Sequence, residues 1–184
     1  MTADWIYSPE GLLSDHVLEV SSAGEIIDLR PRGAESDLIH YAGTLCPGMV
    51  NAHCHLELSM MHEVVPEQTA MAEFVRQIVS GRQTFSEAYQ IETAEKAIVD
   101  MKQRGIVALG DISNLPLTAP VKAAATDFLS YTFVELLGLR SDQANQTHQQ
   151  GQQTQTAFHP LPASISPHAP YSCLLYTSPS PRDS

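Results

Sequence analysis

Two histidines separated by one residue are the first candidates for chemistry in this chain. They are His53 and His55, in the segment CPGMVNAHCHLELS at residues 46–59. If this segment forms a strand, side chains two residues apart lie on one face, roughly 6–7 Å apart along it. Neutral imidazole is a preferred ligand of zinc and other first-row metals. We therefore predict that both histidines bind a metal ion; the alternative is two unrelated polar residues at a strand end.

The cysteine between these histidines is a weaker candidate. Cys54 would point to the opposite face of the strand, into the layer of the following helix, where a cysteine behaves as a small core residue. The three cysteines of the chain, at positions 46, 54 and 173, form no CxxC pair and no disulfide framework. This usage is typical of a reducing compartment, and we expect a cytoplasmic protein.

A third histidine lies between two prolines. His168 occurs in the segment SPHAPYS at residues 166–172. We expect the prolines to fix the backbone and to exclude His168 from a helix and from regular strand pairing. The carboxyl end of a parallel strand is where enzymes built on parallel sheets place their functional groups. The alternative is a histidine that caps a turn.

Three acidic residues fall at or near predicted strand ends. They are Glu57, two residues after His55, Asp111 in GDIS and Glu135 in FVELLG. A carboxylate in such a place can contact substrate, but more commonly it orders a loop or forms an ion pair.

The elements that must position these residues fall into two parts. Residues 1–45 contain short β-rich runs, WIYS, HVLEVSS and EIIDLRP, and the link Ser22-Ala23-Gly24 predicts a hairpin between the last two. A few strands cannot bury a core by themselves, so we expect this part to pack on something larger.

From residue 46 onward, predicted strands alternate with predicted helices. A capping box of Thr84 and Glu87 begins the second helix, and Gly105 ends it. The predicted strands are 46–54, 106–113, 129–138 and 163–170, and the predicted helices are 71–79, 85–104 and 117–126, with a Gln-rich stretch at 141–156 that is either a helix or a solvated linker. This order implies parallel strands joined by right-handed crossovers, in a doubly wound sheet or in half of an eight-stranded barrel.

Composition and charge exclude several classes of protein. The chain has 184 residues, with 10 Lys and Arg against 21 Asp and Glu, and a formal net charge of −11. This balance argues against a nucleic-acid or anionic membrane partner. No apolar run is long enough to cross a bilayer, and no secretory signal opens the sequence.

The last residues differ from the rest of the sequence. Back-translated, CLLYTSPSPRD at residues 173–183 fits a transposase adaptor used to prepare sequencing libraries. We interpret residues 173–184 as read-through from that adaptor; the alternative is a genuine Ser/Pro-rich tail.

The segments PGMVNAHCHLELS and ISPHAPYS, in this order, resemble the amidohydrolase superfamily in its cytosine-deaminase and chlorohydrolase-like branch. Within the branch, the chain looks most similar to aminodeoxyfutalosine and nucleoside deaminases. The resemblance implies an α/β fold: the N-terminal half of a (β/α)8 barrel at residues 46–172, preceded by strands of a small β-sandwich at residues 1–45.

By this resemblance, His53 and His55 are the first two ligands of one divalent metal ion, zinc or alternatively iron. His168 contacts a small-molecule substrate, and Glu57 matches a loop position able to touch it. The family's other parts, a His, a Glu acid/base, a second His and an Asp on strands 5 to 8, have no counterpart here. No catalytic acid or base is therefore expected within this chain.

The implied reaction is hydrolytic deamination of an aminated purine- or pyrimidine-type ring or nucleoside by metal-activated water. One alternative is hydrolysis of a cyclic amide or a chlorinated ring on the same scaffold. Another is a non-catalytic fragment, because two histidines cannot complete a site that needs at least three protein ligands. Half a barrel also exposes unpaired strand edges. We thus expect the 184-residue chain alone to be inactive, prone to aggregation and without stoichiometric metal.

Overall fold

The computed structural model describes residues 1–138 and 140–169. The predicted adaptor read-through at residues 173–184 lies outside this part. The chain divides into two compact units, one from Met1 to Gly48 and one that begins at Met49.

The first unit is built from five short strands. One sheet has the order β2-β1-β5, in which β1 pairs antiparallel with β2 and parallel with β5. The predicted hairpin is confirmed, since β3 and β4 pair antiparallel and the Ser21 N–H donates to the Glu25 carbonyl at 2.8 Å. The strands are β1 (Thr2–Ser8), β2 (Gly11–Leu13), β3 (His16–Val20), β4 (Ile26–Pro31) and β5 (His40–Leu45).

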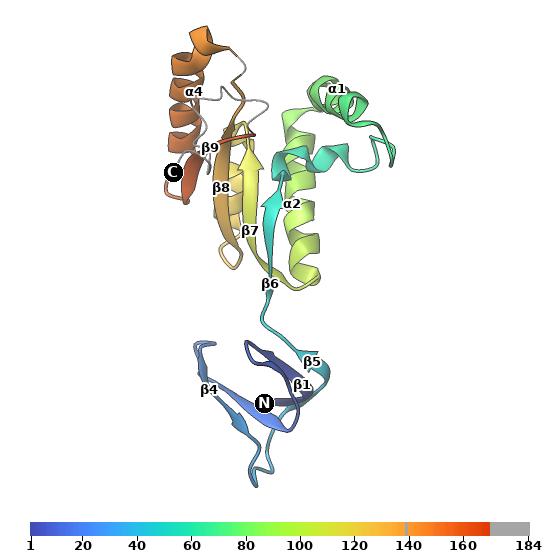
Figure 1. Ribbon diagram of the computed structural model, residues 1–184, viewed down its shortest axis with the longest axis vertical. Helices are drawn as coiled ribbons and strands as arrows, with labels where there is room; N and C mark the ends of the chain where they lie inside the picture. Colours follow the sequence, from blue (N-terminus) through green and yellow to red (C-terminus); the bar gives the residue numbers. More distant parts are fainter. Residues whose placement is uncertain (139, 170–184) are drawn as a thin grey trace, which may run out of the picture. The chain divides into compact units, whose positions relative to one another are not determined.

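The second unit is a parallel sheet with helices between its strands (Figure 1). The strands lie in the order β6-β7-β8-β9, and every neighbouring pair is parallel, as the alternation of elements predicts. The strands are β6 (Met49–Cys54), β7 (Ile106–Ser113), β8 (Leu129–Leu136) and β9 (Ala163–Pro167). The helices are η1 (Leu56–Met61), α1 (Met71–Gly81), η2 (Arg82–Thr84), α2 (Glu87–Gln103), η3 (Pro116–Thr118), α3 (Ala119–Ala124), η4 (Ser141–Gln143) and α4 (Ala144–Ala157).

Helix α2 begins two residues later than its sequence suggests. The predicted capping box of Thr84 is wrong: Ser86 is the N-cap, with an extended backbone and a side-chain oxygen that accepts the Tyr89 N–H at 3.3 Å. Thr84 belongs instead to η2, where its hydroxyl donates to the Gly81 carbonyl at 2.7 Å. Serine is as good an N-cap as threonine, and the backbone conformation decides between them.

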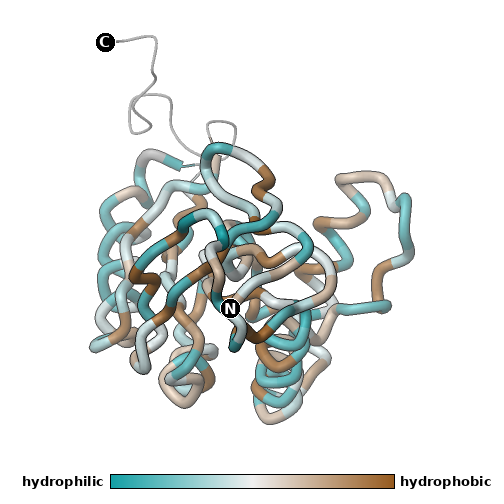
Figure 2. The backbone as a smooth tube through the Cα atoms, turned by 90° about the horizontal axis from the view of Figure 1, so that it is seen from below, coloured by the Kyte–Doolittle hydropathy of each residue, from teal (hydrophilic) through white to brown (hydrophobic). Residues whose placement is uncertain are grey.

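The core of this unit lies between α2 and the sheet. Ala94 and Ile98 of α2 are buried against Leu109 of β7, together with Leu56 and Phe128. Along the helices the chain alternates between hydrophilic and hydrophobic residues (Figure 2), as amphipathic helices require. The Gln-rich stretch forms helix α4 and is not a linker. Among the described residues, no helix has the length and apolar composition needed to cross a membrane.

Candidate functional site

The predicted site residues gather where the four parallel strands end. Carboxyl ends of parallel strands meet at one edge of a sheet, the usual location of ligand sites in such folds. The residues at or next to this edge are His53, His55, Asn114, Glu135 and His168.

A β-bulge in β6 sets the direction of the two adjacent histidines. Asn51 pairs with Leu109 and Cys54 pairs with Asp111, so β6 has one more residue in this interval than β7. Asn51 lies 3.8 Å from the Met101 sulfur of α2 (Nδ2 to Sδ), and Cys54 packs against the same core. Two residues three apart therefore face the helix layer, which strict alternation does not allow.

The bulge leaves His53 and His55 beside each other. Their ring centroids are 5.3 Å apart, in an edge-to-face arrangement. Cys54 faces the helix layer, as predicted, and burial raises the pKa of its thiol to about 11. This thiol is protonated at neutral pH and is a poor metal ligand.

A glycine in the neighbouring strand accommodates the bulge. A Cβ atom on Gly110 would lie 2.6 Å from the Ala52 carbonyl oxygen, closer than real Cβ contacts allow. Glycine in a strand commonly marks such a close approach of backbones. Gly110 therefore supports the path that β6 takes before its two histidines.

The surroundings of His55 favour its neutral form. Burial lowers the pKa of His55. The nearby His53 and His168 lower it further, whereas Glu135 and Asp111 raise it. Neutral imidazole is the form that binds metal ions. Because the charges of Glu135 and His168 affect this pKa, both residues lie in the surroundings of His55.

His168 lies at the end of β9, opposite Glu135 of β8. As the flanking prolines predict, His168 lies outside the regular strand, which ends at Pro167, although its backbone N–H still donates to the Leu136 carbonyl at 3.0 Å. Pro167 lacks a donor, but His168 keeps its own and extends the ladder by one bond. Its Nε2 lies 3.8 Å from Oε1 of Glu135.

Asn114 connects Glu135 to the end of β7. Its side-chain amide donates to the backbone carbonyl and to Oε2 of Glu135, each at 3.2 Å. Sequence reasoning placed Glu135 near a strand end but did not assign Asn114. The signal for Asn114 was its position directly after the strand GDIS.

Glu57 is buried, with 2% of its surface exposed. Its Oε2 accepts the backbone N–H groups of Asn114 (3.1 Å) and Leu115 (3.0 Å), and its Oε1 lies 3.3 Å from Nη2 of Arg82. Burial raises the pKa of Glu57, and the hydrogen bond from Leu115 and the charge of Arg82 oppose this. Glu57 thus ties η1 to the segment that follows β7.

A buried ion pair lies on the helix side of the same strands. Lys122 of α3 pairs with Asp111 of β7, and the side chains of both are fully buried. The Lys122 ammonium also donates to the Thr132 hydroxyl at 2.7 Å and lies 4.7 Å from the centre of the Phe158 ring. Burial lowers the pKa of Lys122, and Asp111 opposes this.

The ion pair reaches the histidine site through the backbone. Oδ1 of Asp111 accepts the N–H of Leu56 at 2.7 Å, directly after His55, and Oδ2 accepts the Ser113 hydroxyl at 2.7 Å. Asp111 therefore fixes the point where β6 turns into η1. Sequence reasoning missed Lys122; the signal was a single charged residue in the apolar run PVKAAA.

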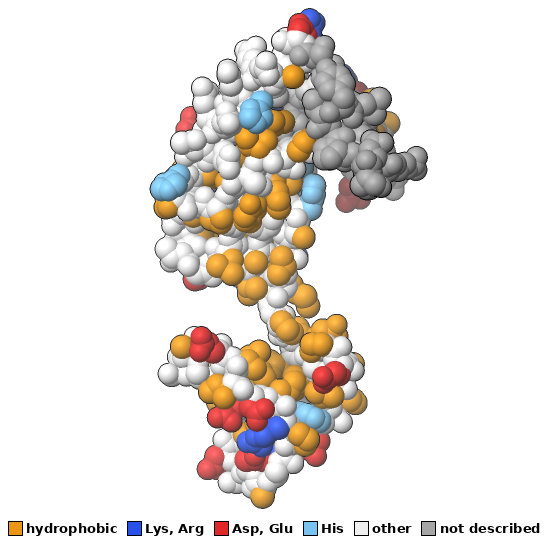
Figure 3. Space-filling model, turned by 60° about the vertical axis from the view of Figure 1, so that its left-hand side comes forward, with side chains coloured by type: hydrophobic (Ala, Val, Ile, Leu, Met, Phe, Trp, Pro, Cys, Tyr) orange, Lys and Arg blue, Asp and Glu red, His pale blue; other side chains and the backbone are white. Residues whose placement is uncertain are grey.

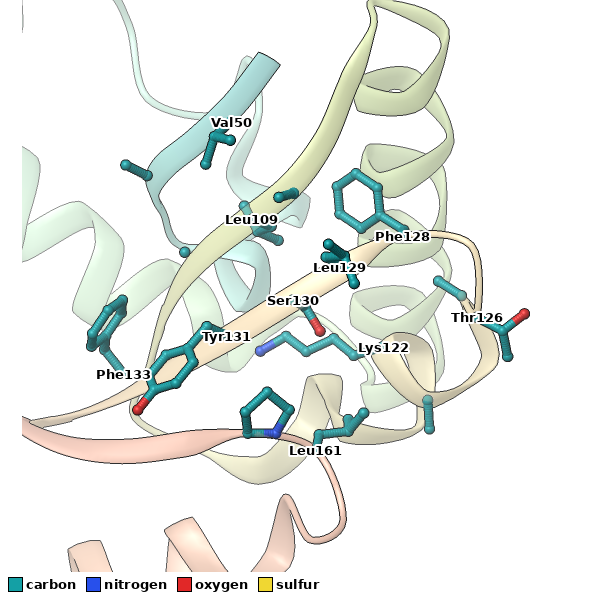
Figure 4. A pocket seen from close by; sticks show the side chains of 16 residues that line it. Val50, Leu109, Lys122, Thr126, Phe128, Leu129, Ser130, Tyr131, Phe133 and Leu161 are labelled. Carbon is teal, nitrogen blue, oxygen red and sulfur yellow. The ribbon is translucent and has the colours of Figure 1, made fainter. Parts of the chain in front are cut away.

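The largest cavity described lies away from these residues. It has a volume of about 680 Å³ and is lined mainly by apolar side chains of β7 and β8, among them Leu109, Leu129, Tyr131 and Phe133 (Figure 4). Figure 3 shows that hydrophobic side chains gather on an exposed face of the second unit, and Val50, Leu129 and Tyr131 are exposed members of the cavity lining. None of the four predicted site residues lines this cavity.

The described residues contain no complete metal site. Within residues 1–138 and 140–169, no group of three or more His, Cys, Asp or Glu side chains is arranged to hold a metal ion. Two adjacent imidazoles, one of them neutral through burial, suit a divalent cation in donor type. A zinc site needs at least three protein ligands.

Three solved structures show which fold this arrangement has. Helicobacter pylori aminofutalosine deaminase, in complex with methylthio-coformycin, matches with a TM-score of 0.69 at 16% identity over 92% of this chain and 44% of its own. An adenosine deaminase from Xanthomonas campestris with bound zinc matches with a TM-score of 0.62 at 18% identity, over 92% of this chain and 42% of its own. Atrazine chlorohydrolase from Arthrobacter aurescens, complexed with zinc, matches with a TM-score of 0.66 at 14% identity, over 94% of this chain and 48% of its own.

These likenesses cover nearly all of this chain but less than half of each solved structure. No protein-family profile and no curated protein sequence matches the chain. The four parallel strands with their helices correspond to part of a (β/α)8 barrel, and the small N-terminal sheets precede that part in the chain. Over most of its length, the chain has the fold of part of these two deaminases and of the chlorohydrolase.

Proposed function

We propose that this chain forms the N-terminal part of a metal-dependent hydrolase that deaminates an aminated purine- or pyrimidine-type ring or nucleoside. The observation that carries the proposal is the pair of imidazoles, His53 and His55, 5.3 Å apart at the carboxyl edge of a parallel sheet. The similarity in fold to two deaminases, one of them with bound zinc, supports it.

His53 and His55 are the proposed ligands of one divalent ion, zinc or iron. When bound, such an ion supplies a water molecule whose pKa it lowers to about 7. The protein's part is to present the two imidazoles together. The bulge in β6 and the close approach at Gly110 do this, and the bond from Leu56 to Asp111 holds the following turn.

His168 and Glu57 are the proposed substrate contacts. His168 stands beside Glu135 at the end of β9, where its ring can donate a hydrogen bond to the substrate ring or to charge that develops on it. Glu57 already accepts two backbone hydrogen bonds and faces Arg82. A substrate that contacts Glu57 must therefore share its carboxylate with these groups, which already fix its orientation.

An alternative function is hydrolysis of a chlorinated ring or a cyclic amide by the same residues. The observation that favours it is the likeness to atrazine chlorohydrolase, with a TM-score of 0.66. Both reactions attack an electron-poor ring carbon, so the products distinguish them: ammonia from a deaminase, chloride from a chlorohydrolase. A non-catalytic role is the third possibility.

The domain assignment is part of the same proposal. We infer that residues 1–45 contribute to a β-sandwich, that residues 46–172 form the first half of the barrel, and that residues 173–184 are adaptor read-through. Sequencing the gene across codon 172 tests this inference. The proposal expects a different coding sequence there, which continues to a His, a Glu, a second His and an Asp.

The decisive experiment uses the chain extended by that recovered sequence. We expect one tightly held divalent ion per chain and release of ammonia from adenosine-type nucleosides. His53→Ala and His55→Ala should each abolish the metal content and the turnover, whereas the control His148→Ala on α4 should change neither. Retention of metal and activity in either site variant would overturn the ligand assignment. For the 184-residue chain alone, we expect no stoichiometric metal.

A further inference from the structure

One level of the parallel sheet carries a thiol, a carboxylate and a hydroxyl in three neighbouring strands. The register pairs Cys54 of β6 with Asp111 of β7, and Asp111 with Thr132 of β8. Asp111 and Thr132 are buried, and Cys54 packs against the core between α2 and the sheet. The central member of this row, Asp111, therefore lies on the helix face, one residue before the level at which β6 passes into His55.

The carboxylate of Asp111 is held through its oxygen Oδ2. This oxygen accepts the Ser113 hydroxyl at 2.7 Å and pairs with the Lys122 ammonium. The ammonium donates in turn to the Thr132 hydroxyl at 2.7 Å, and the side chains of both Lys122 and Asp111 have no exposed surface. These contacts join β7 to α3 and β8, and they fix the direction of the other carboxylate oxygen, Oδ1.

That second oxygen caps the short helix that follows the histidines. The first N–H groups of a helix have no acceptor within the helix, and the N-cap residue of η1, His55, makes no side-chain capping bond. Oδ1 of Asp111 accepts the N–H of Leu56 at 2.7 Å instead. A carboxylate from a neighbouring strand thus takes the part that an N-cap side chain usually plays.

This bond determines where the backbone of His55 lies. The ladder between β6 and β7 ends at Cys54, one residue before His55. The peptide group between His55 and Leu56 is planar, its N–H is bound to Asp111, and the Leu56 side chain is fully buried in the core. Rotation of this peptide group would break a buried hydrogen bond, so the conformation of His55, with ψ at 80°, is held by Asp111.

We propose that Asp111 is a positioning residue for the pair of histidines, and that it acts through the N–H of Leu56. The inference rests on the proposed function only in taking His53 and His55 as a metal site. The acceptor oxygen at position 111 is what the pair requires, whereas the charge of Asp111 serves to match Lys122. A neutral residue that keeps the acceptor should therefore preserve the arrangement of the two rings.

The test compares two double variants of the 184-residue chain. Asp111→Asn, Lys122→Met removes both charges and keeps an acceptor oxygen for Leu56. Asp111→Leu, Lys122→Met also removes both charges, but its side chain of similar size has no acceptor. The readout is the nuclear Overhauser effect between the ring protons of His53 and His55, whose centroids are 5.3 Å apart. We expect this effect to persist in the asparagine variant and to be lost in the leucine variant.

Ser113→Ala is the matched control. It removes the other hydrogen bond to the same carboxylate and leaves Oδ1 with Leu56, so it should lower the stability but keep the effect between the two rings. A loss of the effect in Ser113→Ala as well would show that general loosening of the fold, and not the bond to Leu56, governs the pair, and would count against the proposal.

A second readout is the affinity of the extended chain for zinc. Removal of a group that orients a metal ligand commonly lowers metal affinity about 10–100-fold, and we expect a loss of this order in the leucine variant, with rescue in the asparagine variant. If no form of the extended chain binds metal, the proposed function fails. The effect between the rings, which needs no metal, then still decides the role of Asp111.

An unchanged effect between the rings in a folded Asp111→Leu, Lys122→Met variant would overturn the proposal. If that variant does not fold, Leu56→Pro provides the same test from the other side of the bond. It removes the N–H donor, leaves Asp111 paired with Lys122, and places proline at the first position of a helix, where its ring is tolerated. The effect between His53 and His55 should again be lost.

Discussion

Two groups of polar side chains on and next to β6 and β7 differ in how completely they are paired. On the helix face, Asp111 and Lys122 are fully buried, and each has further partners in Leu56, Ser113 and Thr132. At the open edge, His53 and His55 contact each other, and the described residues offer no third metal ligand beside them. A buried charge must be satisfied within the fold, whereas a binding site keeps capacity for a ligand. The complete network therefore stabilises the fold, whereas the pair of histidines is the site that we propose for a ligand.

The largest effect should come from breaking the complete network. Lys122→Met leaves Asp111 buried without its cation, and removal of one partner of a buried pair costs about 3–5 kcal/mol of unfolding free energy. Urea unfolding monitored by circular dichroism measures the loss. The control Lys96→Met breaks an exposed pair with Glu92 and should change the stability little. If the double variant Asp111→Asn, Lys122→Met is no more stable than Lys122→Met, the unpaired charge is not the cause.

A smaller loss of unfolding free energy is expected from a substitution at Gly110, where β7 lies against β6. Gly110→Ala places a methyl group 2.6 Å from the Ala52 carbonyl oxygen, and overpacking of this kind costs about 1–3 kcal/mol. The same unfolding experiment measures it. Gly138 is the matched control, because its added methyl group would meet no atom within 4 Å, so Gly138→Ala should be close to neutral. Equal stability of the two variants would show that β6 relaxes away from β7.

The smallest effect concerns pH. Burial raises the pKa of Glu57 above its ordinary value of 4.5, so the folded chain binds this proton more tightly than the unfolded chain. The contribution of Glu57 to the free energy of unfolding is present below pH 4.5 and is lost as the pH rises through the folded pKa. The stability of the unsubstituted chain relative to Glu57→Gln, measured by urea unfolding, should therefore fall as the pH rises above 4.5.

Glu73 provides a control of opposite sign. Hydrogen bonds from Gln77 and Arg76 lower its pKa, so the stability that it contributes is lost as the pH falls through the folded pKa. The stability relative to Glu73→Gln should rise over the same interval or stay flat. If both carboxylates show the same slope, general charge repulsion governs the pH dependence.

Local patterns predicted the order and type of the elements well. The run IVALGDIS is a parallel strand, although Val107 near its start is exposed, and the spacing of His53 and His55 indicates side chains that lie together. Such features depend on neighbours in the sequence, which a single chain displays directly. Even there, the choice of Ser86 over Thr84 as N-cap depended on backbone angles that the motif does not encode.

The contacts between strands could not be predicted in this way. Asn114, Glu135 and His168 lie at the ends of three neighbouring strands. Their distances depend on the register of β7 with β8 and of β8 with β9. The bulge in β6 is defined only against β7. The sequence does not indicate that Lys122 pairs with Asp111, because only the packing of α3 on the sheet brings the two side chains together.

The extra residue in β6 is matched to the glycine that faces it. Deletion of Ala52 would restore strict alternation between Asn51 and Cys54, which both keep facing the helix layer, and would remove the carbonyl that approaches Gly110. The position of Gly110 across from it would then have no close backbone to accommodate. Anyone who transplants the His53 and His55 pair to another barrel must therefore move it as a unit, with its additional residue and its facing glycine.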